Sequence, residues 1–212
     1  MISIKNCSLG LLGANCYVIT DSASGESAVV DPGGYDKRID RILSEIGYKN
    51  VKYILLTHGH FDHTDGANEI LKRTSAKVAI GKDDAGMLSN EDDNLSNPFA
   101  YGESEPVKYD ILLSDGDILK LGESEIKVIT TPGHSRGSVT FMCENKLFTG
   151  DTLFKGAIGR TDFPSSSYAQ MQESLVKLSQ LQGDYEVFPG HDNKTTLNNE
   201  RKSNPYLRYI TP

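Results

Sequence analysis

The chain has 212 residues, a formal net charge of −7 and a sequence pI of about 5.2. This length suits one compact domain with a sizeable core, and the acidic balance provides no basic surface for a phosphate backbone, so we do not expect a nucleic-acid partner. No segment reaches the roughly 18 consecutive apolar residues of a membrane span, and the N-terminus lacks the basic-then-apolar layout of a signal peptide. We predict a single-domain cytoplasmic protein, residues 1–212, without a membrane partner.

Short apolar runs between Gly-rich or polar breaks predict strands through the first third of the chain. In chain order, these strands are Ile2–Leu9, 16–20, 28–31 and 53–56. Between the last two, Ile39, Leu43 and Ile46 fall at helical spacing, and Gly47 supplies a C-terminal stop. We therefore expect an amphipathic helix over 35–47 that crosses between two strands.

The second half of the chain repeats this scheme. Its predicted strands are Ile111–Leu113, Ile118–Leu121, 126–130, Val139–Cys143, 146–148 and 186–188. A helix over 168–181 precedes the last strand, with Met171, Leu175 and Leu178 forming an apolar stripe. Strands grouped with outer helices in each half predict an α/β fold of two packed sheets flanked by helices.

Residues 82–110 interrupt this rhythm, because they are polar, acidic around 91–93 and carry the isolated aromatic residues Phe99 and Tyr101. Two interpretations are open: a solvated surface loop, or a lid inserted into the domain that covers a substrate. The three cysteines, at positions 7, 16 and 143, are widely spaced, so we interpret them as small buried hydrophobic residues.

The strongest functional signal is the sequence Thr-His-Gly-His-Phe-Asp-His at 57–63, directly after a predicted strand. In an extended segment, residues two apart point the same way, so His58 and His60 can share one metal ion. Asp62 and His63 lie where the chain turns toward a helix that we expect to begin near Thr64. These two side chains can face a second ion beside the first.

The other two histidines and one aspartate also follow predicted strands. His134 and His191 each end a Pro-Gly-His turn, and Asp151 ends the run Leu-Phe-Thr-Gly-Asp. A lone His is more often a satisfied core residue than a ligand, but all five His of this chain fall at such strand ends. This grouping is expected where loops at one edge of a sheet scaffold carry a site.

The segment 58–63 matches the His-x-His-x-Asp-His signature of the metallo-β-lactamase superfamily, and the turns at 134, 151 and 191 resemble its other metal motifs. The similarity runs from Asn15 to Leu207. It implies the four-layer αββα sandwich of that family and a pair of metal ions. By the family's pattern, one ion is held by His58, His60 and His134, the other by Asp62, His63 and His191, and Asp151 bridges both.

Neutral imidazole and carboxylate ligands suit zinc, iron or manganese, and a carboxylate can span ions roughly 3.5–4 Å apart. We expect two divalent ions, with zinc as the leading candidate. A water shared by such ions loses a proton near neutral pH, which supplies a hydroxide nucleophile. Asp62 is the candidate catalytic residue that orients this hydroxide and accepts its proton.

Asp31 lies in the sequence Val-Val-Asp-Pro-Gly-Gly, which matches a further motif of the superfamily. The acidic residue of that motif usually supports the metal loop, and direct ligation of a metal is the alternative. A strand-ending Asp before a Pro-Gly turn would occupy the same position. Thr57 and Ser135 are candidates to hydrogen-bond the ligands, since a ligating His normally needs an orienting partner.

Within the superfamily, a bridging Asp151 in place of a cysteine argues against the antibiotic-hydrolysing enzymes. His60 together with His63 argues against the flavin-linked diiron type. The stretches 131–138, 159–164 and 204–207 resemble those of the short, glyoxalase-II-like hydrolases, and similar stretches occur in persulfide dioxygenases. Only a short tail follows position 191, so we expect no counterpart of the helical domain with which full-length glyoxalase II enzymes bind glutathione.

The resemblance implies hydrolysis of a small-thiol thioester such as S-lactoylglutathione. Arg160 is the candidate to hold a substrate carboxylate, because a guanidinium offers a bidentate fork; a salt bridge to Asp162 is the alternative for this side chain. The alternative function is a mononuclear iron persulfide dioxygenase, with iron held by His58, His134 and Asp151.

Two further classes are disfavoured. A nuclease of this fold would need a basic cleft or an added nucleic-acid domain, and a non-catalytic metal-binding protein would not need the complete ligand set. We expect a small-molecule substrate and a monomer or small homo-oligomer.

Overall fold

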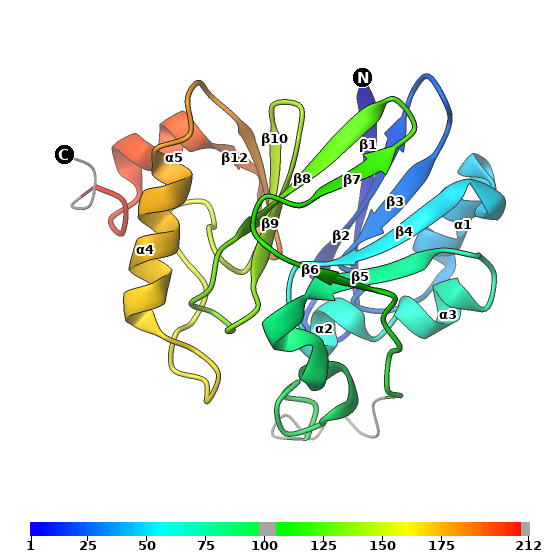
Figure 1. Ribbon diagram of the computed structural model, residues 1–212, viewed down its shortest axis with the longest axis horizontal. Coiled ribbons are helices and arrows are strands. Elements are labelled where there is room, and N and C mark those ends of the chain that lie inside the picture. The colour runs from blue at the N-terminus through cyan, green and yellow to red at the C-terminus, as the bar shows by residue number, and fades with distance from the viewer. Residues whose placement is uncertain (98–104, 209–212) are drawn as a thin grey trace.

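The computed structural model describes residues 1–97 and 105–208, and the strands in these ranges form two six-stranded sheets (Figure 1). The first sheet contains, in spatial order, β1 (Ile2–Leu9), β2 (Ala14–Asp21), β3 (Ser27–Val30), β4 (Val51–Leu56), β5 (Lys77–Gly81) and β6 (Ile111–Leu113). The second contains β12 (Thr195–Thr196), β11 (Glu186–Pro189), β10 (Lys146–Gly150), β9 (Val139–Cys143), β8 (Ser124–Thr130) and β7 (Ile118–Leu121).

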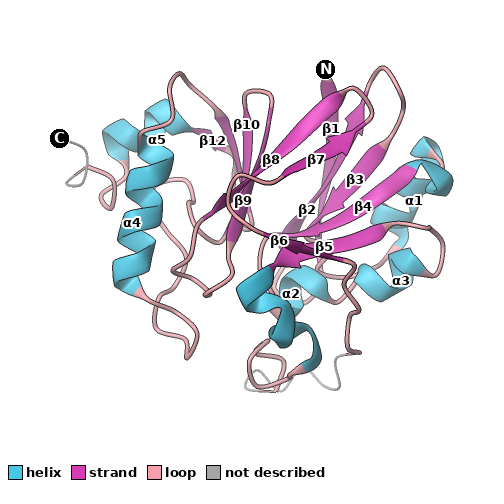
Figure 2. Ribbon diagram, viewed as in Figure 1, coloured by secondary structure: helices cyan, strands magenta, loops and turns pink. Residues whose placement is uncertain are grey.

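Two helices on the right of Figure 2, α1 and α3, and two on the left, α4 and α5, flank this pair of sheets, while α2 lies at the lower edge. The α-helices are α1 (Lys37–Ile46), α2 (Phe61–Thr64), α3 (Ala67–Leu71), α4 (Tyr168–Ser179) and α5 (Leu197–Ser203), and the 3-10 helices are η1 (Tyr48–Asn50) and η2 (Lys82–Ser89). No helix within the described ranges has the length and apolar character needed to cross a membrane.

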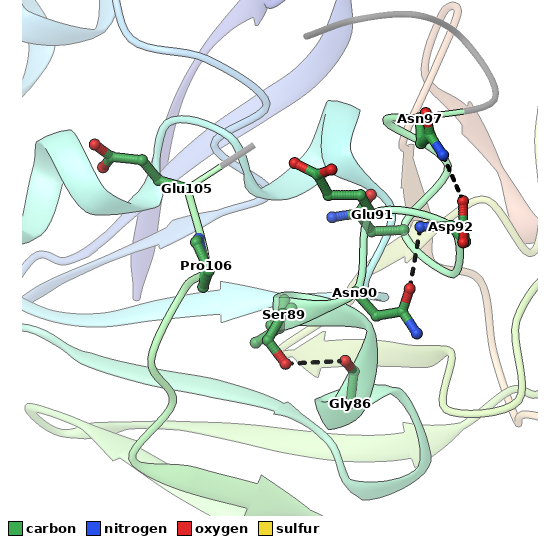
Figure 3. A pocket seen from close by; sticks show the side chains of 10 residues that line it. Gly86, Ser89, Asn90, Glu91, Asp92, Asn97, Glu105 and Pro106 are labelled. Carbon is green, nitrogen blue, oxygen red and sulfur yellow. Dashed lines mark hydrogen bonds between the residues drawn. The ribbon is translucent and has the colours of Figure 1, made fainter. Parts of the chain in front are cut away.

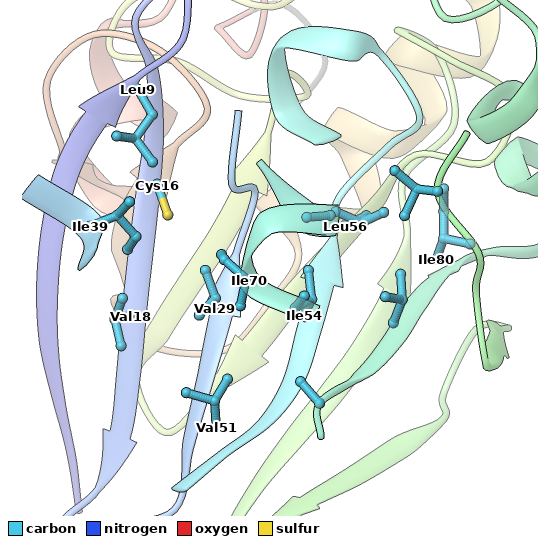
Figure 4. Packing of buried hydrophobic residues seen from close by; sticks show 14 of the residues in the cluster. Leu9, Cys16, Val18, Val29, Ile39, Val51, Ile54, Leu56, Ile70 and Ile80 are labelled. Carbon is cyan, nitrogen blue, oxygen red and sulfur yellow. The ribbon is translucent and has the colours of Figure 1, made fainter. Parts of the chain in front are cut away.

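Three apolar clusters separate four layers. The first packs α1 and α3 on the outer face of the first sheet, where Ile39 and Ile70 cover strand residues such as Ile54 (Figure 4). The second lies between the two sheets around Phe141, and the third lies between the second sheet and α4 around Leu175. The four-layer αββα sandwich expected from the sequence is therefore confirmed.

Helix α1 illustrates how local sequence sets these elements. Asp36 is its N-cap, with the side chain accepting a hydrogen bond from the Arg38 backbone N–H at 2.7 Å. Ile39 and Leu43 face the sheet and are buried. The helix ends before Gly47, whose φ of 83° is costly for other residues, so the predicted span of 35–47 is correct apart from its ends.

Several elements escape the sequence prediction. Strand β5 is buried along most of its length between β4 and β6, so it lacks the alternation that marks a half-buried strand. Helix α5 buries only Leu197 and Glu200, so it shows no apolar stripe. Helix α2 begins at Phe61 rather than near Thr64, so Asp62 and His63 lie in its single turn.

The 82–110 segment starts as part of the packed structure. Its first residues form η2, in which Asp84, Met87 and Leu88 are buried. The backbone N–H of Phe61 donates to the carbonyl of Asn94, which joins the segment to α2. The predicted aromatic residues of the lid, at 99 and 101, lie outside the described residues.

The strand directions bring five strand ends to one edge of the sandwich. Strands β3 and β4 are parallel, so their C-terminal ends lie together. In the second sheet, β8 and β10 flank the antiparallel β9 and therefore run the same way, and β11 is parallel to β10. The loops after β3, β4, β8, β10 and β11 carry every residue that the sequence singles out for metal binding.

We expect Phe141→Ala to lower the free energy of unfolding by about 3–5 kcal/mol, because the ring is fully buried between the sheets and its loss leaves a cavity. Urea unfolding measures this change. Ile118→Ala is the control, since this side chain is 52% exposed and its removal should change stability by less than about 0.5 kcal/mol. Equal losses for the two variants would contradict the assignment of the central core.

Candidate metal centre

The structure brings together all seven side chains that the sequence nominates as metal ligands. Their nitrogen and oxygen atoms form three overlapping groups, in each of which the atoms lie within 4.8 Å of one another. These groups are His58 with His60 and His134; His58 with His63 and Asp151; and Asp62 with His63 and His191. The first and third groups are the two ligand sets implied by the resemblance, and the second joins them.

In the first group, ring nitrogens converge on a common point. The Nδ1 atom of His60 lies 2.9 Å from the Nε2 atom of His134. The Nε2 atom of His58 is buried and has no hydrogen-bond partner within the described part of the chain. A buried polar atom without a partner is costly, so this arrangement fits a cation that accepts nitrogen lone pairs.

Hydrogen bonds on the opposite side of the rings fix their tautomers. His63 Nδ1 lies 3.0 Å from Asp31 Oδ2, and His134 Nδ1 lies 2.8 Å from the carbonyl oxygen of Arg160. Both oxygens can only accept, so each histidine carries its proton on Nδ1. The Nε2 atoms of His63 and His134 therefore face the centre, which is the orientation that metal ligands require.

Asp31 hydrogen-bonds to Thr57 and His63 and belongs to none of the three ligand groups of the described residues. Its Oδ1 accepts from the Thr57 backbone N–H at 2.7 Å, and its Oδ2 accepts from the Thr57 hydroxyl at 2.6 Å. Thr57 Oγ1 in turn lies 3.1 Å from His58 Nδ1. Asp31 adopts a φ of 50°, an uncommon conformation for a non-glycine residue, which these hydrogen bonds help to hold.

Asp151 lies between the two groups, as a bridging carboxylate should. Its Oδ1 is 3.5 Å from His63 Nε2 and is otherwise buried without a hydrogen-bond partner within the described residues. Its Oδ2 is 3.6 Å from His134 Nε2 and 3.7 Å from His191 Nε2. Gly190 leaves room for this carboxylate, because a Cβ there would lie 2.2 Å from Asp151 Oδ1.

The electrostatics of the centre favour cations. Burial lowers the pKa values of His58 and His60 well below the usual range, which keeps both imidazoles neutral and able to bind a metal. Burial alone would also lower the pKa of His63, but the nearby carboxylates, with Asp62 and Asp151 foremost, outweigh it and raise this pKa to about 10. The second group therefore concentrates negative charge around His63.

Asp62 is ionised in this environment. Burial opposes its ionisation, but the adjacent imidazoles of His63 and His191 outweigh that cost and lower the pKa of Asp62. Its Oδ2 lies 3.2 Å from His191 Nε2. Imidazole nitrogens and carboxylate oxygens in two adjoining sets are the ligands expected for a binuclear site of divalent ions.

A cavity of about 330 Å³ opens onto this centre. It is lined by His60, Asp62, His134, Asp151 and His191, together with mainly apolar residues that include Leu12, Leu95, Phe154, Ile158 and Phe163. The Phe163 ring lies edge-on to His60 and His134, with centroids 5.5 and 5.7 Å away. The cavity therefore offers a mainly apolar wall beside the metal-binding atoms.

Arg160 lines this cavity, but its side chain is already engaged. Its Nε and Nη2 donate to the two carboxylate oxygens of Asp162, both at 2.9 Å. Its guanidinium carbon also lies 4.5 Å from the centroid of the Phe163 ring. The salt bridge considered as the alternative for Arg160 is therefore present, and the backbone carbonyl of this residue orients His134.

A larger cavity, of about 850 Å³, lies along the 82–110 segment and contains no predicted metal ligand (Figure 3). It is bounded by Asn90, Glu91 and Asp92 on one side and by Glu105 and Pro106 on the other. Hydrogen bonds within this segment, such as that from Asn97 Nδ2 to Asp92 Oδ1 at 2.7 Å, shape its wall. The cavity is thus separate from the metal centre.

Comparison with known proteins agrees with this geometry. The family model described as "Metallo-beta-lactamase superfamily" matches residues 9–191. The chain belongs to this superfamily. A curated relative named "Hydroxyacylglutathione hydrolase GloC", from Haemophilus influenzae, is 33% identical over 91% of this chain and 92% of its own.

Two solved structures are similar over almost their whole length. The BLEG-1 B3 metallo-beta-lactamase superposes with a TM-score of 0.87 at 30% identity, covering 98% of this chain and 99% of that one. TTHA1623 in a di-iron-bound form superposes with a TM-score of 0.84 at 28% identity, covering 96% and 100%. The superfamily assignment therefore rests on sequence and on fold.

In this superfamily member, two residues near the metal loops escape the sequence analysis. Asp84 is fully buried and accepts a hydrogen bond from the hydroxyl of Ser135 at 2.5 Å. Ser135 was a candidate to hydrogen-bond a ligand, but its hydroxyl contacts Asp84 and Ser138 instead. Asn15 is buried beside the turn that carries His191. No local pattern marks either residue, because each acts on a loop distant in sequence.

We expect the protein to bind close to two metal ions per chain, and Asp151→Ala to lower metal affinity by at least about 100-fold, because the Asp151 carboxylate lies near nitrogens of both ligand groups. Elemental analysis after reconstitution measures occupancy. The exposed Asp83 provides the control Asp83→Ala, which should retain both ions. A wild-type protein that is fully active with one ion would rule out the binuclear assignment.

Proposed function

We propose that this protein is a metal-dependent hydrolase that cleaves thioesters of small thiols, with S-lactoylglutathione as the reference substrate. The observation that carries this proposal is the cluster of His60, Asp62, His134, Asp151 and His191 in the wall of a cavity of about 330 Å³. The relative named as a hydroxyacylglutathione hydrolase supports the thioester as the substrate class.

The residues present fit a pair of divalent ions, with zinc as the leading candidate and iron or manganese as alternatives. Iron is one of these alternatives because a structural relative, TTHA1623, is in a di-iron-bound form. Bound ions would polarise the thioester carbonyl and lower the pKa of a shared water. His58, His60 and His134 would hold one ion, Asp62, His63 and His191 the other, and Asp151 would contact both.

Asp62 is the proposed catalytic residue of the chain. Its carboxylate borders the cavity and is ionised, so it can accept a hydrogen bond from an attacking water and orient that water toward the substrate. Asp31 accepts a hydrogen bond from His63 Nδ1, and the carbonyl of Arg160 accepts one from His134 Nδ1, so both neighbouring imidazoles are held in place. The active site is thus organised before a substrate binds.

Arg160 is the proposed contact for a negatively charged part of the substrate. Its guanidinium is held beside the cavity by Asp162 and by the Phe163 ring. A substrate carboxylate would bind the N–H groups on the other edge of the guanidinium, because Asp162 engages only Nε and Nη2 of its five N–H donors. The remaining lining is mainly apolar, which suits the acyl group of a thioester.

His191→Ala separates hydrolysis from the alternative, persulfide oxidation at one iron. In the hydrolase, His191 belongs to the second ligand group, so its loss should reduce thioester cleavage by at least about 100-fold and lower metal content toward one ion. In the dioxygenase, His58, His134 and Asp151 would suffice. The measurement is thioester cleavage, oxygen uptake with glutathione persulfide and metal content on the same preparations.

Two controls keep this experiment interpretable. Asn193→Ala changes an exposed residue of the same turn and should leave all three readings unchanged, while thermal melting checks that each variant is folded. A chromogenic cephalosporin belongs in the substrate panel, because one structural relative is titled a B3 metallo-beta-lactamase. A folded His191→Ala protein that keeps one iron and full oxygen uptake would overturn the proposed function.

A further inference from the structure

Two buried side chains outside the three ligand groups form hydrogen bonds with the loops that carry the candidate ligands. The first is Asp84, in η2, whose carboxylate is fully buried. It accepts hydrogen bonds from the backbone N–H of Gly59 at 3.1 Å, the backbone N–H of Gly137 at 2.6 Å and the hydroxyl of Ser135 at 2.5 Å. Gly59 separates His58 from His60, and Ser135 follows His134, so one carboxylate joins both loops of the first ligand group.

The backbone of Asp84 packs tightly against the loop that contains Gly137. A Cβ on Gly137 would lie 2.3 Å from the Asp84 backbone nitrogen, so the two backbones are in direct contact. A buried carboxylate is stabilised only while its hydrogen-bond donors remain in place, because the cost of removing its charge from water is large. The loop after β4 and the loop after β8 are therefore fixed relative to each other through this residue.

The second side chain is Asn15, near the start of β2. Its Nδ2 donates to the carbonyl oxygens of Pro189 at 3.1 Å and Asp192 at 2.9 Å, and its backbone N–H donates to the carbonyl of Gly190 at 2.7 Å. Both side-chain partners are acceptors, so the amide must present its NH₂ group to them. These three residues surround His191 in sequence, and the Tyr17 hydroxyl adds a further bond to Pro189 at 2.7 Å.

The two sets of hydrogen bonds are separate. The carboxylate of Asp84 accepts hydrogen bonds from the loops at 59 and 135–137, and the side-chain amide of Asn15 has hydrogen bonds with the turn at 189–192 and with Ser8. We propose that Asp84 is a positioning residue for the first metal site and Asn15 for the second, so that either site can be weakened without the other.

This inference concerns the metal centre of the proposed function but does not depend on thioester cleavage. Its test reads metal binding, so it can succeed when the thioester assay fails, and it can fail when that assay succeeds. The variants are Asp84→Asn and Asn15→Leu, which remove the charge or the amide donors at similar side-chain size. Their controls are Asp83→Asn and Asn6→Leu, at exposed positions of the same helix and the same hairpin.

Each protein is prepared without metal and titrated with cobalt(II), whose visible spectrum reports its ligands. The ligand variants His134→Ala and His191→Ala provide reference spectra for a weakened first site and a weakened second site. We expect Asp84→Asn to lower affinity at the first site by about 10–100-fold, so that one equivalent of cobalt gives the spectrum of His134→Ala. Asn15→Leu should instead give that of His191→Ala, and both controls should match the wild type.

A general loss of stability would weaken both metal sites together. It would therefore not give one variant the spectrum of His134→Ala and the other the spectrum of His191→Ala. Identical spectra for the two variants, the reverse assignment, or unchanged affinity in both would each overturn the proposal. If either variant fails to fold, Ser135→Ala and Tyr17→Phe take their places, because each removes a single hydroxyl from one set of hydrogen bonds. Ser135→Ala should lower cobalt affinity at the first site, and Tyr17→Phe should lower it at the second site. Unchanged affinity in both variants would also overturn the proposal.

Discussion

The structure depends on the burial of carboxylates and imidazoles at the edge where the ends of strands from both sheets meet. Removing such groups from water is costly, and His58 and Asp151 keep atoms without hydrogen-bond partners in the described structure. Metal coordination would satisfy these atoms and offset the negative charge around His63. The sandwich can therefore be understood as a scaffold that holds an otherwise unfavourable polar cluster in one fixed arrangement.

The scaffold does so through polar contacts outside the cluster. Asp31 holds Thr57 and His63, Asp84 joins the loops of the first ligand group, and Asn15 holds the turn of His191. Each contact links segments that are far apart in the chain, so the geometry of the site is a property of the assembled sheets. The apolar side of the cavity, with Phe163 beside His60 and His134, borders the same cluster.

The sequence by itself determined the fold class and the candidate ligands. The spacing of His58, His60, Asp62 and His63 after an apolar run is local, and so are the Pro-Gly-His turns at His134 and His191. Helix α1 was also predictable, because its apolar spacing and its terminal glycine lie within one short segment. Strand β5 was not, since burial between two neighbouring strands removes the alternation that would have marked it.

Only the tertiary structure decided which side chains orient the ligands and what surrounds them. Asp31 was resolved as a support because its carboxylate reaches Thr57 and His63, and Arg160 was found paired with Asp162 beside Phe163. Asp84 and Asn15 carry no recognisable motif. Their hydrogen bonds reach backbone groups 25 to 177 positions away in the chain. Such proximity arises only when β4 pairs with β5 and when the two sheets pack together.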